Sequence, residues 1–316
     1  MNDNLSFCIV AKNNEKTLSS CIESFFDICK NISYIDMGST DKTVDILEKH
    51  NGKKFKKVSE DFASNKSYLI NNVKKDWLFF IEPNEKIING KKEIIEISNK
   101  KEGIFSVSLL QNEILSKTIR FFCDKKIKFE NPIFETIYSK SISSNIILKE
   151  LSPVEIPDEH EQIMRWKIKE PLKTQPMYYE SCFYIKNKKW ECFIKTAEKY
   201  LFMEKNTNLP SYIMIKYYLS LILFYTKRDI EKSIQTLAFC VEKNPTMAEF
   251  WCLLGDINFE MKKYQKAYYF YDNAIILGSQ RLSGDELPID VKKYKEYPDK
   301  MKIICKEKLI DQRSIL

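Results

Sequence analysis

Histidine, glycine and proline are scarce in this chain, and each shortage excludes a class of structure or site. Only two histidines occur among the 316 residues, His50 and His160, and they lie far apart in sequence. A histidine-rich metal centre is therefore excluded, and a Ser-His-Asp triad has little support. The 7 glycines and 10 prolines leave little room for a low-complexity linker, so the composition predicts folded domains that adjoin directly.

Arginine is also scarce, although the chain is basic overall. It carries 51 Lys and Arg against 44 Asp and Glu, a formal net charge of +7, and its lysines are scattered in short pairs such as Lys53-Lys54 and Lys188-Lys189. Nucleic-acid binding typically uses a concentrated, arginine-rich stripe. We therefore expect a solvated lysine-rich surface and no nucleic-acid partner. Attraction to diphosphates or to anionic lipid surfaces stays open.

Long apolar runs and closely paired cysteines are absent as well. The longest apolar-looking stretch, residues 212–225, contains Lys216 and is shorter than the roughly 20 residues that a bilayer-spanning helix needs. The nine cysteines include no Cys-x-x-Cys pair, so we expect reduced thiols. The apolar segment at 5–11 is short for a secretory signal and is typical of a strand. These features predict a cytoplasmic protein without a membrane span.

The composition that remains, 44% hydrophobic and 13% aromatic, is sufficient for one large domain and a smaller one. The pattern changes near residue 175, and before it short strand-like runs alternate with helical segments. This alternation predicts an α/β domain. The expected strands are 5–10, 32–35, 55–58 and 77–81, and the expected helices are 15–29, 40–50 and 63–73. The apolar residues 77–81 suit a central parallel strand that is buried on both faces.

The segment from Ile35 to Thr43 follows an apolar run and opens a helical segment, which is where nucleotide pockets are usually built. In such a pocket Asp36 accepts hydrogen bonds from a base or a ribose. Gly38 allows a tight turn, and Ser39 or Thr40 caps the next helix. The alternative is an ordinary turn between a strand and a helix, because such turns favour the same residue types.

A second polar segment, Glu82-Pro83-Asn84-Glu85, follows the apolar strand at 77–81. Ligands of open α/β sheets bind at the carboxyl ends of parallel strands, so Asp36 and Glu82 are expected to share one crevice. The oxygen atoms of this segment are suitable ligands for Mg²⁺ or Mn²⁺ bound to a diphosphate. Alternatively, the Pro-Asn pair only forms a turn at the end of the strand.

Beyond residue 175 the chain shows the spacing of a tetratricopeptide repeat, a helical hairpin of about 34 residues. The matching positions are Trp251, Leu254, Gly255, Ala267, Tyr271 and Ala274, and a divergent earlier copy is marked by Tyr217, Leu221, Ser233, Leu237, Cys240 and Pro245. Helical segments at 178–203 and 292–309 supply the caps that such a stack needs. Most aromatic side chains of this region are expected in its core, and the others are available for a peptide or for self-association.

The first 135 or so residues resemble a family 2 glycosyltransferase of the GT-A fold, of the branch that carries C-terminal tetratricopeptide repeats. Four blocks carry the resemblance, at residues 8–15, 35–43, 61–67 and 76–85. A weaker fifth block, residues 119–122 with 127–129 and 133–135, is similar to the acceptor-side segment of the family. The resemblance implies an α/β GT-A-like domain with a Rossmann-like mixed sheet at 1–174. It also implies an all-α repeat domain at 175–316.

The resemblance further implies roles for individual residues. Lys12, Asn13 and Asp36 line the nucleoside pocket, and Glu82 lies beside the bound nucleotide sugar. Lys66 approaches the diphosphate at a position where the family has arginine. Lysine offers a point charge there in place of the two-pronged guanidinium.

The metal motif of the family, Asp-x-Asp, corresponds here to Glu82-x-Asn84. The amide removes one ligand charge, so affinity for Mn²⁺ or Mg²⁺ is expected to fall. Glu85 is the neighbour that completes the expected metal ligands Glu82, Asn84 and Glu85. Two alternatives stay open. Either Lys66 and helix N-termini carry the phosphate charge without a metal, or catalysis has been lost.

Inverting sugar transfer needs a carboxylate that deprotonates the acceptor while the acceptor attacks the anomeric carbon opposite the departing diphosphate. Glu135 is the candidate for this base, although Phe134 stands where the family commonly has histidine. The alternative for Glu135 is an ordinary surface acid, since isolated glutamates are usually exposed.

Two functions follow from these residues. The first is a cytoplasmic glycosyltransferase that transfers a sugar from a nucleotide-diphosphate donor, expected to be a UDP-sugar, to a peptide or protein held partly by the repeats. A cell-surface polysaccharide is a further class of acceptor. The second is a catalytically degenerate scaffold whose repeats bind proteins. The repeats also suggest a homodimer. Asp36 and Lys66 favour the enzyme, whereas Asn84 and Phe134 favour the scaffold.

Overall fold

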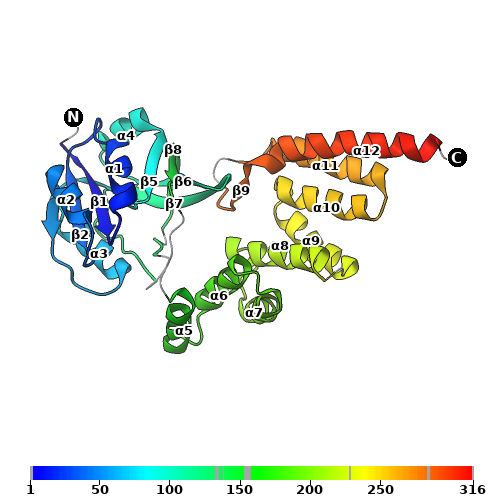
Figure 1. Ribbon diagram of the computed structural model, residues 1–316, viewed down its shortest axis with the longest axis horizontal. Coiled ribbons are helices and arrows are strands. Elements are labelled where there is room, and N and C mark those ends of the chain that lie inside the picture. The colour runs from blue at the N-terminus through cyan, green and yellow to red at the C-terminus, as the bar shows by residue number, and fades with distance from the viewer. Residues whose placement is uncertain are drawn as a thin grey trace. The chain divides into compact units, whose positions relative to one another are not determined.

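The computed structural model describes residues 3–131, 135–137, 139–152, 158–227, 229–282 and 285–314 (Figure 1). The chain divides into two units, residues 1–156 and 157–316, and each is described by itself. The first unit is built on one mixed sheet, and the second is built from helical hairpins. The predicted combination of a GT-A-like α/β domain with an all-α, tetratricopeptide-like domain is confirmed.

The sheet of the first unit has the strand order β3-β2-β1-β4-β7-β6-β8-β5. Strands β1 (Leu5–Ala11), β2 (Ile32–Asp36), β3 (Lys53–Phe55) and β4 (Trp77–Phe80) run parallel to one another. Strand β7 (Ile114–Phe122) pairs antiparallel with both β4 and β6 (Ile104–Gln111). Strand β8 (Ile142–Glu150) pairs parallel with β6 and antiparallel with β5 (Glu85–Asn89). The sheet is therefore parallel on the β1–β4 side and mixed beyond it.

Helices pack on both faces of this sheet. Helices α1 (Glu15–Glu23), α2 (Thr43–Lys49) and α4 (Lys91–Ser98) contribute to the core on one face, and α3 (Phe62–Asn72) contributes to the core on the other. Along β4, Trp77 and Phe79 enter the first core, while Leu78 and Phe80 enter the second. Because successive side chains of a strand point to opposite faces, a strand between two helical layers is apolar throughout. The prediction of a central, doubly buried strand is confirmed.

The boundaries of two predicted helices differ from the structure. The helix expected at 15–29 ends at Glu23, where the Ser24 hydroxyl donates a hydrogen bond to the Cys21 carbonyl oxygen and a turn follows. The helix expected at 40–50 begins at Thr43, because Asp41 accepts hydrogen bonds from the backbone amides of Thr43 and Glu15. Ser39 and Thr40 therefore do not cap α2, which corrects that expectation.

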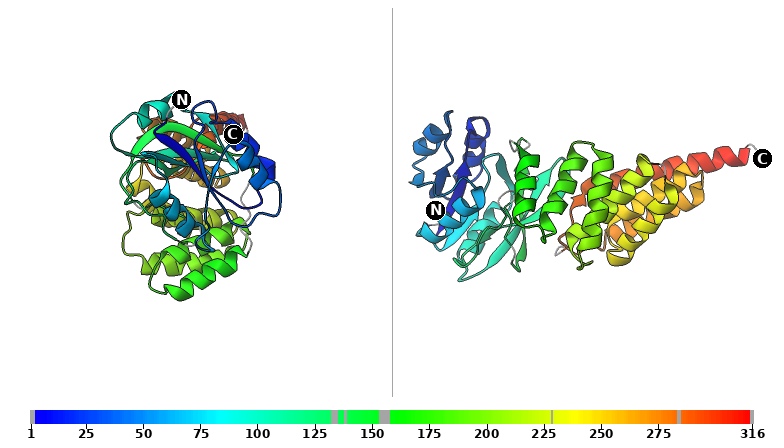
Figure 2. Two further views of the ribbon diagram at one scale, coloured as in Figure 1. Left: turned by 90° about the vertical axis from the view of Figure 1, so that its left-hand side faces the viewer. Right: turned by 90° about the horizontal axis from the view of Figure 1, so that it is seen from below.

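The second unit consists of consecutive helices (Figure 2). They are α5 (Glu159–Lys169), α6 (Gln175–Lys186), α7 (Trp190–Met203), α8 (Pro210–Tyr225), α9 (Ile230–Lys243), α10 (Ala248–Glu260), α11 (Tyr264–Gly278) and α12 (Glu296–Ser314). A short strand β9 (Ile289–Asp290) and a 3₁₀ turn η1 (Val291–Tyr294) precede α12. In the described part of the chain, no helix combines the length and the apolar character that crossing a membrane requires.

Helix α5 belongs to the second unit, whereas the boundary expected at 174/175 assigns it to the first. His160 stacks on Phe183 of α6 with ring centroids 4.8 Å apart. Lys167 of α5 also forms an ion pair with Glu180 of α6. The residues in contact lie on two different helices. The local sequence pattern before residue 175 therefore does not reveal these contacts.

Gly255 allows helices α10 and α11 of the repeat to pack closely against each other. A Cβ atom at this position would lie 2.5 Å from Cε1 of Tyr271, a fully buried ring on α11. We expect Gly255→Ala to lower the free energy of unfolding by about 1–3 kcal/mol, because overpacking outweighs the better helix propensity of alanine. Urea denaturation measures this change.

The matched control is the same substitution in a Tyr271→Leu background, where the ring is absent and the loss should shrink. Equal losses in both backgrounds would show that the contact with Tyr271 is not the cause.

Candidate active site

The predicted site residues follow the parallel strands at one edge of the sheet. Ala11 is in register with Asp36, and Cys8 is in register with Phe80, so β1, β2 and β4 end close together. Asp36 and Glu82 therefore lie on either side of β1, about two strand spacings apart, or roughly 10 Å. The structure brings the two acidic positions to the same edge.

The loops after β1 and β2 are joined by hydrogen bonds. Asn13 has a φ of 53°, and its Oδ1 accepts a hydrogen bond of 2.8 Å from the backbone amide of Thr40. The backbone amide of Asn13 donates a hydrogen bond of 3.0 Å to the hydroxyl of Ser39. Asp36 Oδ1 accepts from the Ser39 amide at 3.0 Å, across the turn in which Gly38 has a φ of 95°. The turn predicted at Gly38 is present, and Lys12 and Asn13 are exposed beside it.

Helix α3 places Lys66 inside the first unit. The helix starts at a capped turn, in which Asp61 Oδ1 accepts a hydrogen bond of 2.7 Å from the Ser64 amide. Asn65 adds hydrogen bonds to the backbone of the preceding loop. The Lys66 side chain, only 3% exposed, reaches Glu82 Oε1 at 2.6 Å and Glu135 Oε2 at 3.3 Å. Lys66 thus contacts Glu82, which follows β4 at the edge of the sheet where Asp36 ends β2.

Arg120 completes this arrangement, and the sequence did not single it out beyond its place in the weak fifth block. It lies on β7, which pairs with β4 through Leu78–Phe122 and Phe79–Phe121. Its Nη1 is 2.6 Å from Glu82 Oε1, and its Nη2 is 3.2 Å from Glu85 Oε1. Apart from that block, the sequence signal is a charged residue between the apolar Ile119 and Phe121. We name Lys66, Glu82, Glu85, Arg120 and Glu135 the charged cluster.

The charges of the cluster support one another. Burial alone would raise the pKa of Glu82, but the positive charges and hydrogen bonds of Lys66 and Arg120 outweigh it and lower the pKa to about 2. Burial likewise opposes the charge of Lys66 and of Arg120, yet the neighbouring carboxylates raise the pKa of both. Burial raises the pKa of Glu85. Glu82, Lys66 and Arg120 are therefore ionised near neutral pH.

The segment Glu82–Glu85 forms a closed turn. The Glu82 amide donates to Glu85 Oε2 at 3.0 Å, and the Glu85 amide donates to the Glu82 carbonyl oxygen at 3.0 Å. Asn84 is buried, and its side-chain amide donates to the carbonyl oxygen of Ser152 at 2.7 Å. The turn alternative is thus correct as a description of the backbone, and it places the Asn84 amide against the end of β8.

The expected metal ligands Glu82, Asn84 and Glu85 do not fit a divalent ion in this arrangement. One oxygen of Glu82 is held by Lys66 and Arg120, and both oxygens of Glu85 accept hydrogen bonds. Over the described ranges, no group of three or more His, Cys, Asp or Glu side chains is placed to hold a metal. Two resident cations occupy the neighbourhood in which the ion was expected. We derive no chemical step from a metal.

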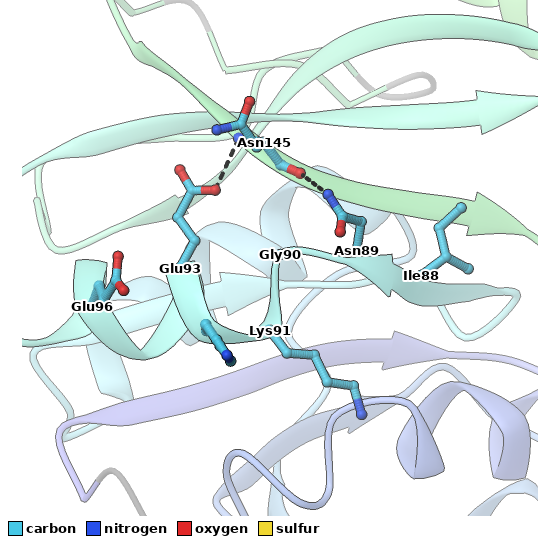
Figure 3. Close-up of a pocket in the computed structure, with 8 residues that line it drawn as sticks. Ile88, Asn89, Gly90, Lys91, Glu93, Glu96 and Asn145 are labelled. Carbon is cyan, nitrogen blue, oxygen red and sulfur yellow. Dashed lines mark hydrogen bonds between the residues drawn. The ribbon is translucent and has the colours of Figure 1, made fainter.

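A surface pocket of about 600 Å³ lies away from these residues (Figure 3). Its lining comes from the end of β5, the start of α4 and β8, and consists of Ile88, Asn89, Gly90, Lys91, Lys92, Glu93, Glu96 and Asn145. Hydrogen bonds from Asn89 to Asn145 and from Asn145 to Glu93 join the strands and the helix there. None of the predicted site residues lines it. Phe134, the departure from the family pattern, lies outside the described residues.

Residues 6–83 match the family described as Glycosyl transferase family 2. The matched range includes Lys12, Asn13, Asp36, Lys66 and Glu82. No curated protein matches the chain.

Several solved structures are similar to parts of this chain. Glucosyl-3-phosphoglycerate synthase from Mycobacterium tuberculosis, in complex with Mn²⁺ and uridine-diphosphate-glucose, is 16% identical, with a TM-score of 0.29. That match covers 34% of this chain and 44% of the synthase, less than half of its length. MamA from Desulfovibrio magneticus RS-1 is 16% identical over 49% of this chain and 84% of that one, with a TM-score of 0.36. The Sgt2 TPR domain from Aspergillus fumigatus is 14% identical over 45% and 82%, with a TM-score of 0.34.

Proposed function

We propose that this protein is an inverting glycosyltransferase that transfers a sugar from a nucleotide-diphosphate donor, a UDP-sugar, to a peptide or protein. The family match of residues 6–83 carries the proposal. It is supported by the convergence of Asp36, Lys66, Glu82 and Glu135 from separate segments on one edge of the sheet.

In this proposal the donor binds at the carboxyl ends of β1, β2 and β4. Asp36 accepts hydrogen bonds from the uridine, and Lys12 and Asn13 border the same pocket from the loop after β1. The hydrogen bonds between Asn13, Ser39 and Thr40 hold these loops in place before the donor arrives. Such preorganisation reduces the entropy lost on binding.

The transfer step requires a base and a stabilised leaving group. The acceptor nucleophile attacks the anomeric carbon, its new bond to the sugar forms, and the bond between the sugar and the diphosphate breaks. The carboxylate of Glu135 accepts the proton of the nucleophile, and the diphosphate leaves with the bonding electron pair. Lys66 is the cation assigned to stabilise the negative charge that develops on the departing diphosphate.

The helical unit is proposed to hold part of the acceptor or to form a homodimer. The exposed aromatic side chains Phe202, Tyr225 and Tyr269 offer contact area outside the core. The expected Mn²⁺ or Mg²⁺ finds no fitting ligand set in Glu82, Asn84 and Glu85, and nucleotide binding with and without Mn²⁺ tests whether a metal takes part.

A second candidate function is a scaffold without transferase activity. One observation favours it. The Asn84 side chain donates its amide to Ser152 and contributes no carboxylate at the motif position. In that case the helical unit carries the function by binding proteins.

A thermal-shift experiment with nucleotide sugars separates the two candidates. A ligand that binds only the folded state stabilises it by about 2.7 kcal/mol at one hundred times its Kd. We expect UDP-sugars to raise the Tm of the full chain and Asp36→Ala to abolish this shift, because the pocket loses its acceptor for the uridine.

Asp45→Ala, a change at an exposed carboxylate on α2, is the matched control and should keep the shift. A full shift in Asp36→Ala would contradict the assigned pocket. The absence of a shift with any donor would favour the scaffold.

A further inference from the structure

The two cations of the charged cluster converge on one oxygen atom. Lys66 Nζ and Arg120 Nη1 each lie 2.6 Å from Glu82 Oε1. Two cations that both contact one oxygen atom lie close enough to repel each other, so a shared anion is needed to hold them together. An oxyanion bound by two cationic donors is also the arrangement that a phosphate group takes.

The donor capacity of these cations exceeds what the carboxylates use. A lysine ammonium carries three N–H donors and a guanidinium carries five. Lys66 donates to Glu82 and Glu135, and Arg120 donates to Glu82 and Glu85. Within the described ranges, Arg120 Nε has no hydrogen-bond partner. Both side chains can therefore accommodate a further anion.

Glu82 is the member of the cluster closest to solvent. Its side chain is 21% exposed, against 3% for Lys66 and 12% for Arg120. A rotation of the Glu82 carboxylate is thus the smallest movement that uncovers both cations. Two positive charges would then face the sheet edge at which the donor is proposed to bind.

A divalent ion beside Glu82 would find few free oxygen ligands. It would lie beside Lys66 and Arg120, which repel it, and it would have to displace Arg120 from Glu85 and the Glu82 amide from the same carboxylate. Hard divalent ions need several oxygen ligands, and this turn has already used most of its oxygens internally.

We propose that Lys66 and Arg120 neutralise the diphosphate of the donor without a divalent metal, and that Glu82 occupies their binding position until the donor arrives. This inference rests on the proposed function, because it concerns the same donor. Glu82 is thereby a competitor of the diphosphate and not a metal ligand. Arg120 becomes a donor-binding residue.

Isothermal titration calorimetry of the full chain with UDP, GDP and CDP tests the proposal, in EDTA and in Mn²⁺. The expected result is binding of at least one nucleoside diphosphate with Kd values that agree within about twofold in the two buffers. Binding that requires Mn²⁺ would overturn the inference and leave the transferase proposal intact. No binding in either buffer would overturn the proposed function and this inference with it.

Single substitutions distinguish the two possible roles of Glu82, a competitor of the diphosphate or a ligand of a metal ion. In EDTA, Glu82→Gln should bind the same nucleotide about threefold or more tightly, because a competing charge is removed, whereas the loss of a metal ligand would weaken binding in Mn²⁺. Lys66→Met and Arg120→Gln should weaken binding about tenfold or more, since each removes a charge-assisted hydrogen bond.

Lys91→Met removes an exposed lysine that pairs with Asp27 on another part of the unit, and it is the matched control with unchanged Kd. Circular dichroism melting establishes which variants fold. If Lys66→Met does not fold, Glu82→Gln still tests the proposal. Weaker binding by a folded Glu82→Gln protein would refute the competitor role.

Discussion

Glu135→Gln is expected to lower kcat by about 10²–10⁴-fold while the protein still binds its nucleotide-sugar donor. The amide keeps the shape of the side chain but cannot accept the proton of the acceptor, and this range is typical for the loss of a positioned base. Glu135 lies 3.3 Å from Lys66 Nζ and is 18% exposed, so its carboxylate is held in place and is accessible from solvent. Single-turnover kinetics with an identified donor and acceptor measures the change.

Glu130→Gln is the matched control for this prediction. Glu130 is an exposed acid near Glu135, in a β-bridge with Thr136, and its substitution should leave kcat unchanged. Full activity of Glu135→Gln would assign the base role to another group, and the alternative of an ordinary acid would then hold for Glu135.

Asp256→Leu is expected to lower the free energy of unfolding by about 3 kcal/mol or more, because each buried hydroxyl that loses its acceptor costs about 1–3 kcal/mol. Asp256 on α10 accepts hydrogen bonds from the hydroxyls of Tyr225, Tyr271 and Tyr297 at 2.7, 2.7 and 2.6 Å. These tyrosines come from α8, α11 and α12, so one carboxylate joins helices across the repeats. Leucine would leave the fully buried hydroxyl of Tyr271 without a partner. Chemical denaturation of the full chain measures the effect.

Two further variants test the cause of this loss. Asp256→Asn should lose less, because the Tyr271 and Tyr297 hydroxyls both donate to Oδ1, which an amide oxygen can replace. Asp272→Leu removes a partly exposed partner of Lys302 and should cost only about 0–1 kcal/mol. Equal losses for Asp256→Leu and Asp272→Leu would show that the tyrosine network contributes little.

The positions most readily predicted were those governed by local periodicity. The continuous burial of β1 and the continuous apolar run of β4 follow from strands that lie between two helical layers. The hairpin α10–α11 was predictable because Gly255 and Tyr271 stand at a fixed repeat spacing, and they do meet in the structure. Boundaries were less predictable, as at α2, because Asp41 bonds to the amide of Glu15 on a different segment.

The predicted site likewise has features that could be predicted from the sequence and features that could not. Asp36 and Glu82 were expected at one edge because each directly follows a parallel strand, and the strand register places them there. Their roles in binding, the base role of Glu135 and the role of Lys66 at the diphosphate stay predictions. The direction of the Asn84 side chain was not predictable, because it depends on the carbonyl oxygen of Ser152, far away in sequence.

The sequence by itself determined the alternation of strands and helices, the repeat spacing and the order of the polar segments, since each depends on residues a few positions apart. Only the tertiary structure decided that Arg120 and Lys66 share one oxygen of Glu82 and that the Asn84 amide donates to the carbonyl oxygen of Ser152. The physical reason is that the strength of a charge interaction depends on distance and burial. Both quantities are set when the antiparallel strand β7 pairs with β4, a contact between segments about 40 residues apart.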